Sequence, residues 1–167
     1  MKLGIVGTGN VTYRHFEEFS KIDGVKVEAV CDVNSENLNL FTKKFGNHLR
    51  KYSSVDEMLK EEKNFDGICN NTPDKFHKEV SLKILEKGIN IFSEKPLAEN
   101  YEDAKILTDL AHKQKVINMV NFTYRESSGY QKLVETIKSN TLGDIKHVNA
   151  NYYQSWLTSN TWGNWKE

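Results

Sequence analysis

The chain has 167 residues, of which 38% are hydrophobic and 28% are charged, and this composition is typical of one globular domain or of one domain with part of another. Its 23 basic and 23 acidic residues cancel, so it lacks the positive charge expected of a protein that binds nucleic acid or membrane surfaces. We therefore expect a small neutral or polar ligand, with neither nucleic acid nor membrane as a partner.

The two cysteines, Cys31 and Cys69, lie in apolar runs and form neither a metal-binding spacing nor a disulfide framework. A reducing compartment is the simpler interpretation, so we expect a cytoplasmic protein. Glycine interrupts the N-terminal apolar run too early for a signal peptide, and no run approaches the roughly 20 apolar residues of a membrane span. The histidines show no ligand-like spacing, and no metal site is predicted.

Short apolar runs alternate with helical patterns from the first residue to about Val120, which is typical of repeated βα units and a parallel sheet. A helix is predicted over the stripe Phe76, Val80 and Ile84, and it ends at Gly88, which suits the C′ position. The predicted strands cover residues 3–6, 25–31, 65–69, 89–92 and 116–120, with a weaker candidate at 51–52.

The pattern changes after Val120, and we expect a first domain over residues 1–121 and the start of a second over 122–167. A capping box at Asn100 and Asp103 predicts the last helix of the first domain. Leu133, Val134 and Ile137 predict a helix in the second domain. Residues 145–156 alternate in part and predict a long strand outside the first sheet.

The segment Gly7-Thr8-Gly9-Asn10-Val11-Thr12 follows the first strand and opens a helix, which is the context of the dinucleotide-binding fingerprint. The first glycine permits a tight turn, the second lets the backbone approach a pyrophosphate, and the helix N-terminus supplies N–H groups. A plain βα turn is the alternative. Thr12 replaces the third glycine, so we expect looser packing of the helix on the strand. The candidate cofactor-binding residues here are Gly7, Thr8, Gly9, Asn10 and Val11.

Asp32 ends the second strand at about the spacing of 20 residues at which an acidic side chain bonds a ribose 2′-hydroxyl. A carboxylate would repel a 2′-phosphate, which favours NAD over NADP. Either Asn34 or Ser35 could instead cap the following helix, and both interpretations can hold together. These features together predict a Rossmann-type, doubly wound parallel sheet.

Asn71, Thr72 and Pro73 follow the strand predicted over residues 65–69, and Asp74 is expected to cap the next helix. In doubly wound sheets ligands bind outside the carboxyl ends of the strands, so this loop should share one rim with the glycine segment and Asp32. His77 lies one turn inside the helix and is interpreted as a surface histidine that could face this rim.

The segment Ser93-Glu94-Lys95-Pro96-Leu97 follows the fifth predicted strand and reaches the same rim. A lysine at the end of a buried strand is costly to place and hard to explain by packing. Lys95 is therefore the first candidate for chemistry, although a solvated loop lysine is the alternative.

Taken in order, these motifs resemble the Gfo/Idh/MocA family, the relatives of glucose-fructose oxidoreductase and inositol dehydrogenase. The resemblance extends over essentially the whole chain, and Glu-Lys-Pro-Leu-Ala after a strand is its most specific part. The residues that carry it are Gly7-x-Gly9, Val30-Cys31-Asp32, Asn71-Thr72-Pro73 with His77, residues 88–98, and Leu142-Gly143-Asp144-Ile145.

The resemblance implies a Rossmann domain followed by an α/β domain whose open sheet often forms a homo-oligomer interface. It implies hydride transfer between a nicotinamide and a carbinol of a sugar, inositol or related polyol. Lys95 and Glu94 would be the catalytic residues, and Lys95 would contact both the substrate hydroxyl and the cofactor. His77, Glu94 and Lys95 join Gly7, Asp32 and Asn71-Thr72-Pro73 as cofactor-binding candidates.

The chain departs from the family pattern at two places. The family often has a Gly-Phe-x-x-Arg stretch where the two domains join. The corresponding stretch here, residues 121–125, lacks the glycine but retains Arg125 as a substrate-side candidate. The family's Asp-x-x-x-His motif, whose histidine works with the lysine in proton transfer, has no counterpart after Trp165. The second domain is thus expected to be incomplete, and the chain to be the front part of an enzyme.

Two other functions fit parts of the sequence. A non-catalytic nucleotide sensor or scaffold would retain only the dinucleotide-binding half. An S-adenosylmethionine-dependent methyltransferase also has a glycine loop and an acidic residue after its second strand. However, that function leaves Glu94-Lys95-Pro96 without an evident role.

Overall fold

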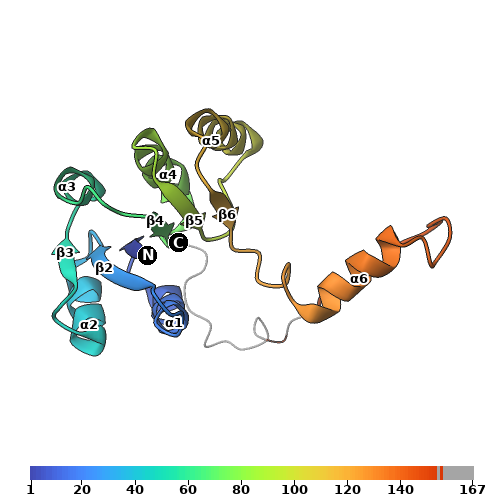
Figure 1. Ribbon diagram of the computed structural model, residues 1–167, viewed down its shortest axis with the longest axis horizontal. Coiled ribbons are helices and arrows are strands. Elements are labelled where there is room, and N and C mark those ends of the chain that lie inside the picture. The colour runs from blue at the N-terminus through green and yellow to red at the C-terminus, as the bar shows by residue number, and fades with distance from the viewer. Residues whose placement is uncertain (154, 156–167) are drawn as a thin grey trace. The chain divides into compact units, whose positions relative to one another are not determined.

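The computed structural model describes residues 1–153 and residue 155, and the chain divides into two compact units, Met1–Phe122 and Thr123–Glu167. Strands and helices alternate throughout the first unit (Figure 1). Its strands are β1 Lys2–Val6, β2 Lys26–Cys31, β3 Arg50–Tyr52, β4 Gly67–Asn70, β5 Asn90–Ser93 and β6 Asn118–Val120. Its helices are α1 Asn10–Phe19, α2 Ser35–Phe45, α3 Val55–Glu61, α4 His77–Glu86 and α5 Tyr101–Gln114, with a 3₁₀ turn η1 at Asp74–Phe76.

The strands form a six-stranded sheet in the order β3-β2-β1-β4-β5-β6, and every neighbouring pair is parallel. This confirms the predicted doubly wound sheet, including the weak third strand. The chain order reverses between β1 and β4, which is the switch point where ligands bind in such sheets. The carboxyl ends of β1 and β4 are in register there, with Val6 beside Asn70.

Helices cover both faces of the sheet (Figure 1). On one face, α1 and α2 pack over a core that includes Ile5, Val30 and Phe41. On the other, α3, α4 and α5 pack over a second core around Ile68 and Ile84. Because the central strands are buried on both faces, they read in the sequence as continuous apolar runs rather than as alternating ones.

Most helix boundaries follow the predicted signals. Asn34 and Asn100 are the N-caps of α2 and α5, and the Asn100 side chain accepts the Asp103 N–H. Gly88 lies just beyond α4 with a φ of +66°, as its predicted C′ position requires. The predicted cap at Asp74 is wrong. Pro73 keeps an extended backbone (φ −59°, ψ 150°) and occupies the N-cap position, so the 3₁₀ turn begins at Asp74 itself.

In the second unit, helix α6 spans Ser128–Lys138, as its apolar spacing predicts. The strand predicted over residues 145–156 is wrong for residues 145–153, which have no regular secondary structure. A strand needs a hydrogen-bonded neighbour, and all strands among the described residues belong to the sheet of the first unit. Residues 154 and 156 lie outside the described part of the chain.

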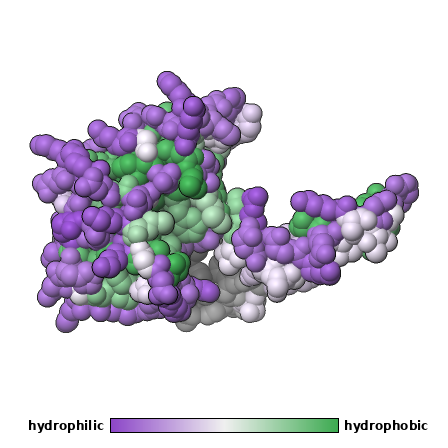
Figure 2. All heavy atoms as spheres, in the orientation of Figure 1, coloured by the Kyte–Doolittle hydropathy of each residue, from purple (hydrophilic) through white to green (hydrophobic). Residues whose placement is uncertain are grey.

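The view of the first unit in Figure 2 shows mainly hydrophilic residues, with apolar patches between them. Among the described residues, no helix is long and apolar enough to cross a membrane. Both cysteines are buried free thiols. Burial, with the Asp32 carboxylate beside it, raises the pKa of Cys31 to about 12, so this thiol stays protonated at neutral pH.

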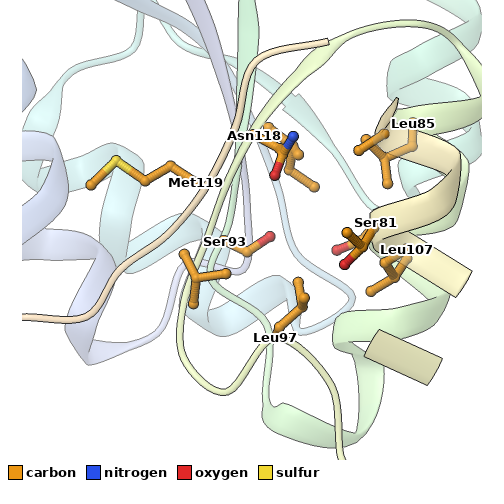
Figure 3. Close-up of a pocket in the computed structure, with 11 residues that line it drawn as sticks. Ser81, Leu85, Ser93, Leu97, Leu107, Asn118 and Met119 are labelled. Carbon is orange, nitrogen blue, oxygen red and sulfur yellow. The ribbon is translucent and has the colours of Figure 1, made fainter. Parts of the chain in front are cut away.

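A small cavity of about 20 Å³ is lined by residues of strands β5 and β6 and of helices α4 and α5. Ser93 is 1% exposed, and its hydroxyl points across this space toward Ser81 (Figure 3). The Ser93 Oγ has no hydrogen-bond partner among the described residues. By contrast, the Ser81 Oγ accepts a hydrogen bond from Asn70 Nδ2 at 3.0 Å.

This difference predicts opposite effects for two serine substitutions. Ser93→Ala removes an unpaired buried hydroxyl, so the free energy of unfolding should stay unchanged or rise by up to about 1 kcal/mol. Ser81→Ala removes an acceptor of Asn70, so the same quantity should fall by about 1 kcal/mol. Urea unfolding of both variants measures this, and equal losses in the two variants would contradict the assignment of Ser93 as unpaired.

Candidate functional site

A cleft of about 600 Å³ opens at the carboxyl edge of the sheet, around the switch point between β1 and β4. The loops that follow β1, β2, β3 and β4 all contribute to its walls. Several predicted cofactor-binding residues therefore lie together, although they are far apart in the sequence. Those that line the cleft are Gly7, Gly9, Val11, Asp32, Asn71, Thr72 and Pro73.

The two glycines of the first loop have different surroundings. Gly7 has a φ of +89°, and a Cβ there would lie 2.6 Å from the Asn71 carbonyl oxygen. Gly9 has ordinary backbone angles, and a Cβ there would meet no atom within 4 Å. Gly7 is thus required by the fold, whereas Gly9 keeps open a part of the cleft that a side chain would fill.

Helix α1 begins directly at this loop and points its N-terminus at the cleft. Gly9 is its N-cap and supplies no side-chain hydrogen bond to the first-turn N–H groups. Asn10 and Val11 in the first turn are exposed. The free N–H groups, the helix dipole and the open space over Gly9 together fit the pyrophosphate of a dinucleotide.

Thr12 corrects the expectation of loose packing between α1 and β1. Its side chain is 0% exposed. Its Oγ1 donates to the Gly7 carbonyl at 2.7 Å and accepts from Asn71 Nδ2 at 3.1 Å. The Thr12 hydroxyl, which takes the place of the third glycine, thus forms hydrogen bonds with the loops after β1 and β4 and connects them.

Asp32 holds the glycine loop in place from the end of β2. Its Oδ2 accepts from both the backbone N–H and the hydroxyl of Thr8, at 2.7 and 2.8 Å. Its Oδ1 accepts only the Asn34 N–H, at 2.8 Å, among the bonds of the described residues. A carboxylate oxygen has two lone pairs, so Oδ1 can accept one further hydrogen bond, as a ribose hydroxyl would require.

The Lys95 turn follows β5 at the same edge of the sheet. The Glu94 N–H donates to the Asn70 carbonyl at 2.9 Å, which sets the turn beside the loop that lines the cleft. Lys95 is exposed, and the Lys95–Pro96 peptide is cis. The predicted lysine therefore stands at the rim, next to the cleft.

Glu94 is held by three donors from separate parts of the chain. His15 Nε2 and Asn121 Nδ2 both donate to its Oε1 at 2.7 Å, and the Lys95 N–H donates to its Oε2 at 3.2 Å. Burial opposes ionisation, but these hydrogen bonds and the His15 ring keep the pKa of Glu94 below its ordinary value. Glu94 is therefore an ionised acceptor that fixes the turn, a role suited to positioning Lys95.

His77 is not a surface histidine, as its place in a helical pattern suggests. It is 0% exposed, and its Nε2 lies 2.7 Å from the Thr72 carbonyl oxygen. Its Nδ1 contacts the Pro96 carbonyl oxygen. The first residue of α4 points inward here because the loops after β4 and β5 fold over it.

Comparison with known proteins shows the family of the chain. The Gfo/Idh/MocA family, described as an oxidoreductase family with an NAD-binding Rossmann fold, matches residues 1–122. The chain belongs to this family. It is 31% identical over 151 residues to a glucose-6-phosphate 3-dehydrogenase of Bacillus subtilis, a match that covers 90% of this chain and 42% of that protein.

Two other members of the Gfo/Idh/MocA family show the same partial coverage. A myo-inositol 2-dehydrogenase of Thermotoga maritima is 27% identical over 143 residues, which cover 86% of this chain and 42% of the relative. The WlbA dehydrogenase of Bordetella pertussis, crystallised with NADH and UDP-GlcNAcA, is 25% identical with a TM-score of 0.78. That match covers 85% of this chain and 43% of the WlbA chain. The chain thus spans less than half of each relative.

Some features of this family member's site could not be predicted from spacing alone. His15 and Asn121 hold Glu94, but they lie 79 and 27 residues from it, and no local pattern connects them. Arg125, the substrate-side candidate, belongs to the second unit. It is exposed, and its role stays a prediction.

Proposed function

We propose that the chain supplies the cofactor-binding part of an NAD-dependent oxidoreductase that acts on a carbinol of a sugar, inositol or related polyol. The observation that carries the proposal is that the cleft around Gly7 and Asp32 shares one sheet edge with the Lys95 turn. The named relatives support the substrate class, since their names specify a sugar phosphate and an inositol.

Bound NAD would supply the hydride acceptor, and the chain's own residues would prepare the substrate. The Lys95 ammonium would donate a hydrogen bond to the reacting hydroxyl and would stabilise negative charge on its oxygen as the proton leaves. Glu94 and its donors would hold the turn, and Arg125 would contact substrate. NAD is preferred to NADP because the Asp32 carboxylate would face a 2′-phosphate.

We also propose that this chain is the front part of a longer enzyme, because it spans only about 42% of its relatives. The complete protein would be a cytoplasmic homo-oligomer. A non-catalytic dinucleotide sensor is the alternative, since the cofactor cleft is present within residues 1–122. Reading the coding sequence after Glu167 decides between them: a glycine-rich stretch followed by Asp-x-x-x-His supports the enzyme, and its absence supports the sensor.

Cofactor preference tests the proposed role of Asp32. Asp32→Asn keeps an acceptor for Thr8 but removes the negative charge. The affinity for NADPH relative to NADH should therefore rise at least about tenfold, the equivalent of about 1.4 kcal/mol. Titration of the 167-residue chain by nucleotide fluorescence measures both affinities.

The control for this experiment is Asp109→Asn. Asp109 is an exposed carboxylate on α5, paired with Lys105 and outside the cleft. The Asp109→Asn variant should leave the affinities for NADH and NADPH unchanged. Absence of nucleotide binding by the parent chain, or an equal change for both nucleotides in Asp32→Asn, would refute the site.

A further inference from the structure

His77 joins the two loops that meet beside the cleft. Its Nε2 is 2.7 Å from the carbonyl oxygen of Thr72, a residue that lines the cleft. Its Nδ1 contacts the carbonyl oxygen of Pro96, the residue after Lys95. The ring itself does not line the cleft, so it contacts the loops rather than the space for the ligand.

Both partners of the ring are carbonyl oxygens, which accept hydrogen bonds and cannot donate them. A neutral imidazole carries one N–H, so it can satisfy only one of these two contacts. With a neutral ring, a nitrogen lone pair would face a carbonyl lone pair in a fully buried place. Two donated hydrogen bonds require a proton on each nitrogen.

We propose that His77 is an imidazolium that donates from both ring nitrogens and so holds the Lys95–Pro96 turn against the Thr72 loop. It is a positioning residue for Lys95, and this part of the inference rests on the proposed function. The protonation state does not rest on it.

Opposing forces act on this charge. Burial disfavours an imidazolium, and His77 is the first residue of α4, where the helix dipole also disfavours a cation. Two charge-assisted hydrogen bonds, each roughly twice as strong as a neutral one, offset these costs. The charged side chains nearest to His77 along the segments that meet there are Asp74, Lys75, Lys78, Glu79, Glu94 and Lys95, and Lys78 pairs with Asp103 of α5.

The two loops depend on His77 to different degrees. Asn70 holds the Thr72 loop independently, because its Oδ1 accepts from the hydroxyl of Thr72 at 2.7 Å and from its N–H at 3.2 Å. Among the described residues, His77 is the hydrogen-bond partner of the Pro96 carbonyl. Loss of the imidazolium should therefore free the Pro96 end of the Lys95 turn, which Glu94 still holds at its other end, while the wall of the cleft stays in place.

Nitrogen-15 NMR of the histidine rings in the 167-residue chain tests the protonation state without any activity. We expect both His77 nitrogens to show the shift of a protonated imidazolium nitrogen at neutral pH. His112, which is exposed on α5, gives the reference signal of a solvated ring. One unprotonated nitrogen in His77 would overturn the double-donor assignment.

Kinetics of the complete gene product test the positioning role. His77→Phe keeps a ring but has no donor, and we expect kcat to fall about 10- to 100-fold, as misplacement of a reacting group by about 1 Å can cause. His77→Gln keeps a donor and should lose less, and KM for NAD should change little in both. An unchanged kcat in a folded His77→Phe variant would overturn the role. If the parent protein has no NAD-linked activity, the proposed function fails, and the NMR result still decides the protonation of His77.

Discussion

Replacement of Lys95 by alanine in the complete gene product should lower the rate of hydride transfer by about 10²- to 10⁴-fold. Lys95 follows Glu94 in the turn beside the cleft, and it is the cation of the turn that Glu94 and His77 hold. Its removal leaves developing negative charge on the substrate oxygen without this donor. Affinity for NAD should be nearly unchanged, because Lys95 does not line the nucleotide cleft.

Single-turnover kinetics measure the hydride-transfer step, and nucleotide fluorescence measures binding in the same variant. Lys105→Ala is the matched control, since Lys105 is an exposed lysine of α5 that pairs with Asp109. It should leave both quantities unchanged. A Lys95→Ala enzyme with normal turnover would remove Lys95 from the mechanism.

Replacement of Gly7 by alanine should lower the free energy of unfolding by about 2–4 kcal/mol. The φ of +89° disfavours any residue with a side chain, and the new Cβ would lie 2.6 Å from the carbonyl oxygen of Asn71. That oxygen belongs to the backbone of the loop after β4, so it can move only if β1 and β4 separate. Chemical denaturation of the 167-residue chain measures the loss.

Two other glycines separate the causes of this loss. Gly24 has a φ of +78° but open space around it, so Gly24→Ala should cost only about 1 kcal/mol, from backbone strain alone. Gly9→Ala meets no atom and should leave stability nearly unchanged, yet its methyl group would enter the cleft and weaken nucleotide binding. Equal stability of the Gly7→Ala and Gly9→Ala variants would contradict the inference that Gly7 is required for folding and Gly9 for nucleotide binding.

The sequence by itself determined the alternating strands and helices of the first unit, because continuous apolar runs and helical stripes report local burial. It also placed Gly7, Asp32, Thr72 and Lys95 at strand ends, where parallel strands carry them to one edge. It failed over residues 145–153, since an alternating pattern forms a strand only where a neighbouring strand offers hydrogen bonds.

Only the tertiary structure decided which side chains hold the candidate catalytic turn. His15, Glu94 and Asn121 come from three distant segments, and their hydrogen bonds exist only after the sheet has assembled. Thr12 was expected to loosen the packing of α1, and His77 was interpreted as a surface residue. Both side chains are instead buried and form hydrogen bonds with neighbouring loops. Local sequence patterns record periodicity and spacing, whereas the partners of a buried polar atom depend on which distant loops the fold brings against it.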